Sequence, residues 1–174
     1  MTPGEQTPIA VRIIGCGRWL RGDDQVGLMI AEELLGALDG DVDSSARVAV
    51  ESTEAPSADL FVEGLERDAL LVIIDAARLT EGVTPGTWTR IDYLQDAQRV
   101  RDKCRTSTHA LSVDAALEMA AALDMMPSHV WIYAVAGEDF GYSEHLSARL
   151  AQAVPEITAR IRADVVDWLK RYAR

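Results

Sequence analysis

Three side chains of the kinds that bind metal ions and move protons follow apolar stretches or lead into a predicted helix: Asp24, Asp75 and His109. Asp75 comes directly after the apolar run LLVII, where a buried carboxylate is costly unless it is paired, hydrogen-bonded or bound to a metal. Two carboxylates and one imidazole suit a divalent ion such as zinc or nickel. Three protein ligands also leave positions open for water or a substrate group, as Lewis-acid chemistry requires.

Structural explanations compete with this interpretation at each position. Asp23 and Asp24 start a predicted helix, where carboxylates accept free backbone N–H groups. Asp75 can be satisfied by the amides of the next turn, and a lone histidine such as His109 is more often structural than catalytic. A dinucleotide site is disfavoured, because Leu20 replaces the third glycine of Gly-x-Gly-x-x-Gly and the acidic helix start repels a pyrophosphate.

Alternating strand and helix patterns predict the elements that carry these residues. Short β-branched or continuous apolar runs predict strands, and amphipathic spacing predicts helices. The expected strands cover residues 9–14, 47–52, 69–77, 86–93 and 129–137, and the expected helices cover 26–38, 57–68, 112–126 and 157–172. Ser112 is a candidate helix cap, His145 is expected on a helix surface, and 86–93 is expected near a sheet edge. We predict a single-domain, three-layer α/β/α sandwich around a mostly parallel sheet of about five strands.

This architecture predicts where a site forms. In open α/β sheets, ligands bind beyond the carboxyl ends of the strands. The segments 15–24, 51–54 and 137–139, together with Asp75, follow strands and are expected at that edge. The polar loop that carries His109 is expected to enter its helix from the same side.

Composition narrows the class of protein. The 174 residues suit one domain spanning 1–174, and we expect residues 1–8 to be flexible. Acidic residues outnumber basic ones by 28 to 17, for a formal net charge of -11, so no binding to nucleic acid or anionic membranes is expected. No apolar run is long enough for a membrane span, and no secretory leader is visible. Cys16 and Cys104 lie far apart and are expected to be buried thiols, which points to the reducing cytoplasm.

Three sequence motifs follow one another along the chain, in an order and at spacings that match those of a known family. They are GCGRWLRGDDQVG, which contains Asp24, then VIIDAA with Asp75, and then TSTHALSV with His109. Together they resemble the maturation endopeptidases of nickel–iron hydrogenases, and the resemblance spans about residues 11 to 155. Arg18 replaces the asparagine usual after Gly-x-Gly in that family, and ESTEAP, with Glu51, replaces an Asp-Gly-Gly/Thr segment.

The resemblance implies an enzyme, an aspartic-type endopeptidase that removes a C-terminal extension from the large-subunit precursor of a hydrogenase after nickel has been inserted. It implies that Asp24, Asp75 and His109 are the catalytic, metal-contacting residues, with Asp23 capping or orienting. The nickel is expected to arrive with the substrate, without a stable protein-bound cofactor. The alternatives are a non-catalytic, metal-dependent binding module for the large subunit and a nucleotide-utilising α/β enzyme.

Overall fold

Five strands form one sheet in the computed structural model, which describes residues 9–38, 47–79, 81–96 and 110–172. The strands are β1 Ile9–Cys16, β2 Arg47–Thr53, β3 Leu65–Arg78, β4 Trp88–Asp92 and β5 His129–Gly137. Their order in the sheet is β2-β1-β3-β5-β4, and all neighbours are parallel except β4, which runs antiparallel to β5 at one edge. The mostly parallel sheet is confirmed, as is the edge position of the strand expected at 86–93.

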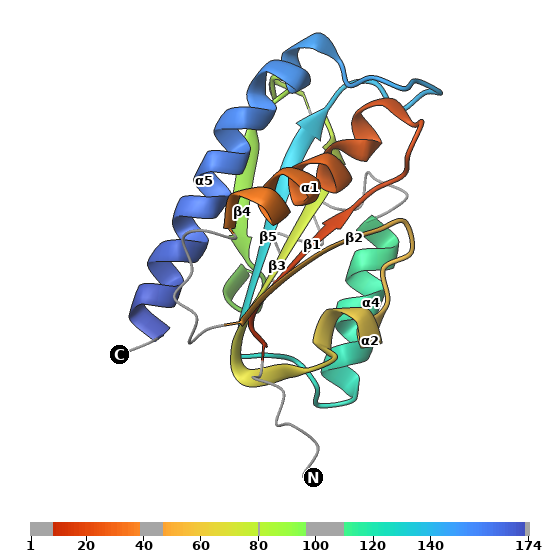
Figure 1. The fold of residues 1–174 in the computed structure, drawn as a ribbon. Helices are drawn as coiled ribbons and strands as arrows, with labels where there is room; N and C mark the ends of the chain where they lie inside the picture. The colour runs from red at the N-terminus through yellow and green to blue at the C-terminus, as the bar shows by residue number, and fades with distance from the viewer. Residues whose placement is uncertain (1–8, 39–46, 80, 97–109, 173–174) are drawn as a thin grey trace, which may run out of the picture.

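Helices cover both faces of this sheet (Figure 1). They are α1 Val26–Leu38, α2 Ala58–Val62, α4 Ala110–Ala122 and α5 Ala148–Tyr172, with the short 3-10 helix η1 Gly22–Gln25 ahead of α1. Because side chains alternate along a strand, Val72 and Ile74 of β3 pack in the core beneath α1 and α5, while Leu71 and Ile73 pack beneath α2 and α4. A strand buried on both faces reads as a continuous apolar run, which is why this one was predictable. The three-layer sandwich is confirmed.

The helix expected over residues 57–68 is shorter in the structure, where α2 covers only Ala58–Val62. Ser57 caps α2 by accepting a hydrogen bond from Leu60 N at 3.3 Å, but the helix ends at Val62 and residues 65–68 begin β3. Gly64, at φ +71°, turns the chain between the two elements. The buried guanidinium of Arg12 donates to the carbonyls of Leu60, at 2.5 Å, and Glu63, at 2.6 Å. This long-range contact helps to terminate the helix, and local periodicity does not reveal it.

Three other helix boundaries also differ from expectation. α4 begins at Ala110, so Ser112 lies in its first turn and is not the cap. The same helix stops at Ala122 instead of residue 126, because Asp124 takes up a left-handed conformation at φ +54°. α5 begins at Ala148 instead of residue 157. His145 lies exposed in the segment before that helix, and not on a helix surface as expected.

Some expectations fall on residues outside the described ranges, among them those for residues 1–8 and Cys104. Cys16 is a buried free thiol, as expected. Among the helices that the structure describes, none combines the length and apolar character needed to cross a membrane.

Glycines let η1 and α1 lie directly against the end of the sheet. A Cβ on Gly27 would overlap the carbonyl oxygens of Cys16 and Ile74, which belong to β1 and β3. A Cβ on Gly15 would likewise overlap the carbonyl oxygen of Gly27. The glycines of the first motif are therefore explained by backbone packing, without a phosphate.

Two glycines of α1 provide a matched test of this packing. We expect Gly27→Ala to lower the free energy of unfolding by about 3 kcal/mol, because backbone on two strands must move to admit the methyl group. Gly36→Ala should instead raise it by about 0.5–1 kcal/mol, since Gly36 is exposed in the same helix and a Cβ there meets nothing within 4 Å. Urea unfolding of both variants measures the difference, and a similar effect at the two positions would contradict the packing role.

Candidate functional site

The candidate site lies at the carboxyl edge of the parallel strands, which is the upper edge of the sheet in Figure 1. η1 follows β1 there, and Asp75 lies near the end of β3. The segment between β5 and α5 reaches the same edge, because the amide of Asp23 donates to the carbonyl of Asp139 at 2.7 Å. The topology therefore brings segments from residues 17–25, 75–78 and 137–147 to one region.

Asp23 fastens two of these segments together. Its fully buried carboxylate accepts three backbone hydrogen bonds, from Glu138 N at 2.7 Å, Asp139 N at 3.1 Å and Ser147 N at 2.7 Å. Gly137 makes room for it, since a Cβ at that position would lie 2.6 Å from the Cβ of Asp23. Asp23 does not cap its own helix; it has the orienting role, and it fixes the backbone next to Asp24.

Asp24 is also buried, with 6% of its surface exposed. Its carbonyl accepts a hydrogen bond from Arg18 N at 3.3 Å and packs directly on Gly17, where a Cβ would overlap it. The backbone around Asp24 is thus held on one side by the turn after β1 and on the other by Asp23.

Asp75 is equally buried, with 6% exposed, and its Oδ1 has no hydrogen-bond partner among the described residues. Burial is the main cause that raises its pKa to about 7, the negative charge of Asp24 raises it further, and the N–H of Ala76 acts in the opposite direction. The structure thus brings Asp24 and Asp75 close enough to share an electrostatic environment. A carboxyl that titrates near neutrality can hold or release a proton, and a carboxylate pair can also bind a divalent cation.

Cys16 is the third titratable group of this region. Burial raises the pKa of its thiol, and the charge of Asp75 raises it further. The thiol therefore remains protonated and packs in the core beneath α2 and α4, with Ile14 and Phe61. Its expected packing role agrees with this environment.

His109, the third predicted ligand, lies outside the described residues; α4 begins at the next position, Ala110. Within the described part of the chain, no group of three His, Cys, Asp or Glu residues is arranged to hold a metal ion. Two of the three predicted positions are thus brought together, and the metal-binding role of the trio stays a prediction.

The sequence analysis did not single out an exposed apolar rim beside these acids. Trp19 is 41% exposed, Leu20 42% and Tyr142 77%, and they come from the two segments that Asp23 joins. Ser143 N donates to Leu20 O at 3.1 Å, and Leu20 itself adopts φ +62°, a conformation that few non-glycine residues take. The sequence feature that could have indicated this rim is RWLR, in which two large apolar residues lie between arginines in a predicted turn.

No family model matches the sequence, and no curated protein matches it. Solved structures do match. The nickel–iron hydrogenase maturation protease HybD from Thermococcus kodakarensis aligns with a TM-score of 0.70 and 17% identity, over 91% of this chain and 99% of its own. The hydrogenase maturating endopeptidase HybD from E. coli aligns with a TM-score of 0.68 and 17% identity, over 91% of this chain and 93% of its own. The endopeptidase HycI from Escherichia coli aligns with a TM-score of 0.68 and 20% identity, over 89% of this chain and 90% of its own.

The chain has the fold of the hydrogenase maturation proteases. The resemblance expected from the three motifs is thereby confirmed as a likeness of fold. The two departures from the family motifs can be placed on that fold. Arg18 is exposed at the turn after β1, and Glu51 on β2 pairs with the buried Arg12 at 3.6 Å. The carboxylate of Glu51 therefore has an ion-pair partner in Arg12.

The orienting role of Asp23 predicts a large loss of stability when its charge is removed. We expect Asp23→Asn to lower the free energy of unfolding by about 3 kcal/mol, because an amide places N–H groups against backbone donors that now point at a carboxylate. Asp139→Asn is the matched control, since Asp139 is exposed and its side chain accepts one described hydrogen bond, from Gly141 N at 2.9 Å. Chemical denaturation compares the two, and equal losses would show that the three hydrogen bonds of Asp23 stabilise the fold no more than the one of Asp139.

The coupling of Asp24 and Asp75 predicts a titration. In metal-free protein, the side-chain carboxyl carbon of Asp75 should titrate with a midpoint near 7 in a carbon-13 NMR experiment. Asp24→Asn should move that midpoint to lower pH, because it removes the like charge, whereas the exposed Glu144→Gln should leave it unchanged. A midpoint that stays in place in Asp24→Asn would mean that the two acids do not interact.

Stability should depend on pH through the same group. The folded pKa of about 7 lies above the unfolded value of about 3.9, so protonated Asp75 stabilises the fold. This contribution is fully present below about pH 4 and is lost as the pH rises towards 7. Asp75→Asn should therefore gain stability relative to the natural protein across that window, by a few kcal/mol at most, at about 1.4 kcal/mol for each pKa unit.

Proposed function

We propose that this protein is an endopeptidase that removes a C-terminal extension from the nickel-loaded large-subunit precursor of a nickel–iron hydrogenase. The observation that carries the proposal is the pair of buried acids, Asp24 and Asp75, at the carboxyl edge of a chain with the fold of hydrogenase maturation proteases. That edge is where this class of sheet places its ligands.

The chemistry proposed for the site uses the nickel of the substrate as the recognition element. Asp24, Asp75 and His109 contact that nickel, and Oδ1 of Asp75, which has no other partner among the described residues, is available for it. Either the nickel polarises the scissile carbonyl, or a carboxylate activates the attacking water. In the second route, Asp75 takes a proton from the water as its oxygen attacks the carbonyl carbon. Asp75 then gives this proton to the amine nitrogen as the C–N bond breaks, which leaves a carboxylic acid on one product and an amine on the other.

The surroundings of the site suit a protein substrate. Exposed large apolar side chains mark protein-binding surfaces when they gather beside a site, and Trp19, Leu20 and Tyr142 lie on the segments that frame the acids. We therefore propose a folded precursor as the partner, with its tail reaching the acids. The net charge of -11 gives no reason to expect nucleic acid. The two widely spaced cysteines favour action in the cytoplasm.

The alternative is a non-catalytic module that binds the large subunit through its metal. Two departures from the family motifs favour it: Arg18 in place of asparagine, and ESTEAP without glycines after β2. Such a module would use the same acids for binding and leave the precursor intact.

The deciding experiment incubates the purified protein with nickel-loaded and nickel-free precursor and follows the tail by mass spectrometry. We expect cleavage of the loaded precursor only. Asp24→Asn, Asp75→Asn and His109→Ala should each slow it by at least about 100-fold, in line with the loss of a general acid–base or metal contact. Asp167→Asn, an exposed acid of α5, is the control and should cleave normally.

Two outcomes would overturn the proposal. A stable complex with uncut, nickel-loaded precursor would identify the binding module instead. Normal cleavage by all three site variants would show that the acids and His109 are not the catalytic group.

A further inference from the structure

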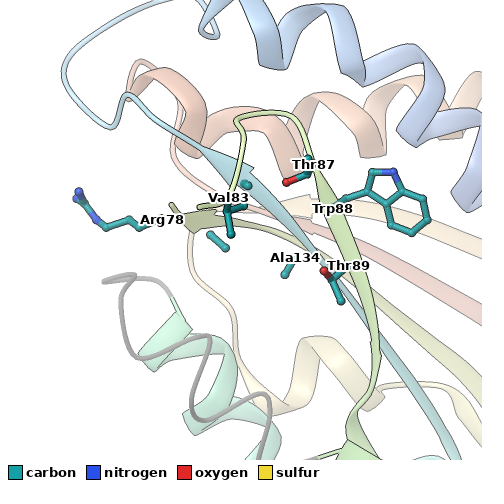
Figure 2. Close-up of a pocket in the computed structure, with 8 residues that line it drawn as sticks. Arg78, Val83, Thr87, Trp88, Thr89 and Ala134 are labelled. Atoms are coloured by element: carbon teal, nitrogen blue, oxygen red, sulfur yellow. The ribbon is translucent and has the colours of Figure 1, made fainter. Parts of the chain in front are cut away.

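A small pocket opens at the carboxyl ends of β3 and β5, next to the start of β4 (Figure 2). Its cavity volume is about 80 Å³. It is lined by Ala77, Arg78, Val83, Thr87, Trp88, Thr89, Ala134 and Ala136. Every one of these residues lies in the described part of the chain, and none is one of the candidate acids, Asp24 and Asp75.

The pocket exists because alanines occupy the ends of two strands. Further back on the same face, Ile73 and Ile132 fill the core beneath α2 and α4, whereas Ala77, Ala134 and Ala136 leave the space at the strand ends empty. The alternation of side chains along a strand places these alanines on that face. The floor of the pocket is therefore made of methyl groups.

The loop before β4 forms a fixed wall. Gly86 N donates to Ala136 O at 2.8 Å, and Ala136 N donates to Thr87 O at 2.8 Å, so this loop is tied to β5. Val83 projects into the hollow opposite Ala134 and Thr89 (Figure 2). The pocket is thus bounded on the side of this loop by backbone that is hydrogen-bonded in place.

The larger lining residues direct their polar or aromatic ends elsewhere. The indole of Trp88 lies on the other side of β4, where its ring centre is 5.8 Å from that of Tyr133 (Figure 2). Arg78 extends away from the pocket and places its guanidinium 4.6 Å from the ring centre of Phe140. The Thr87 hydroxyl donates to Thr84 O at 2.8 Å. The surface left for a ligand is aliphatic, with the hydroxyl of Thr89 at its side.

The pocket lies beside the candidate acids. Asp75 stands opposite Ala134 in the register of β3 and β5. Ala77 is two residues further along β3 on the same face, a distance of about 7 Å. An extended polypeptide covers that distance in about two residues. A peptide whose scissile bond is at Asp75 can therefore place a neighbouring side chain in the pocket.

Its size selects the side chain. A volume of about 80 Å³ exceeds the roughly 30 Å³ of one water but is about half of a cavity that holds benzene, at roughly 150 Å³. We propose that the pocket binds one small aliphatic side chain of the precursor, from a residue within two positions of the bond that is cut. This rests on the proposed endopeptidase function and adds a determinant of sequence specificity to it.

The test varies the precursor and the pocket together. Residues within two positions of the cut are changed one at a time to Gly, Ala, Val and Phe, and kcat/KM is measured for each precursor. At one position the natural enzyme should prefer the small aliphatic residue over Gly by about 10-fold or more, the range expected for methylene groups in an apolar pocket. Ala77→Val and Val83→Phe fill the pocket from two different elements, and both should shift the preference at that position to Gly or Ala.

A control variant distinguishes the effect of filling the pocket from general damage to the enzyme. Ala151→Val adds the same atoms at an exposed position of α5 and should keep the natural order of preference. A lower rate with the same order of preference in both filled variants would refute the pocket while leaving the endopeptidase function in place. Failure of the natural protein to cut any precursor would refute that function and, with it, this subsite.

Discussion

The burial of two like-charged groups in one place is the constraint on which the site depends. Asp24 and Asp75 are each only 6% exposed, and the charge of Asp24 raises the pKa of Asp75. A buried carboxylate without a partner is unfavourable, and a second carboxylate nearby makes it more so. Two events relieve this: a proton on Asp75, or a cation between the acids. The fold thus keeps two buried acids together at a place where a positive charge reduces their repulsion.

The surrounding structure is what keeps these acids from moving apart or turning to solvent. Asp23 is fully buried and its carboxylate accepts hydrogen bonds from three backbone amides, so it holds the backbone next to Asp24 in place. Gly15 and Gly27 let α1 lie against the ends of β1 and β3, which places η1 directly at the sheet edge. Preorganisation of this kind costs stability locally, and the two apolar cores above and below the sheet compensate for it.

Features that depend on the local pattern of apolar and polar residues could be predicted from the sequence. The apolar run before Asp75 predicted a central strand, and the rule that ligands gather beyond the carboxyl ends of strands then placed Asp24 and Asp75 at one edge. Local pattern failed where distant residues decide the outcome. Residues 65–68 begin β3, where Leu65 pairs with Ile9 of β1, instead of continuing a helix. The amide partners of Asp23 come from more than a hundred residues further along the chain. The pocket at Ala77 and Ala134 was equally invisible, because an empty volume arises from three strands together.

Under the proposed function, the protonation of Asp75 and the arrival of nickel are linked. A divalent cation near a carboxyl favours its charged form, so a precursor that presents nickel lowers the pKa that burial and Asp24 have raised. A precursor without nickel meets a site in which burial and the charge of Asp24 keep the pKa of Asp75 raised, which favours its protonated form. Such an acid is a weaker ligand and a weaker base. The same electrostatic conflict that destabilises the empty site therefore favours the loaded precursor, without a deep pocket for the metal itself.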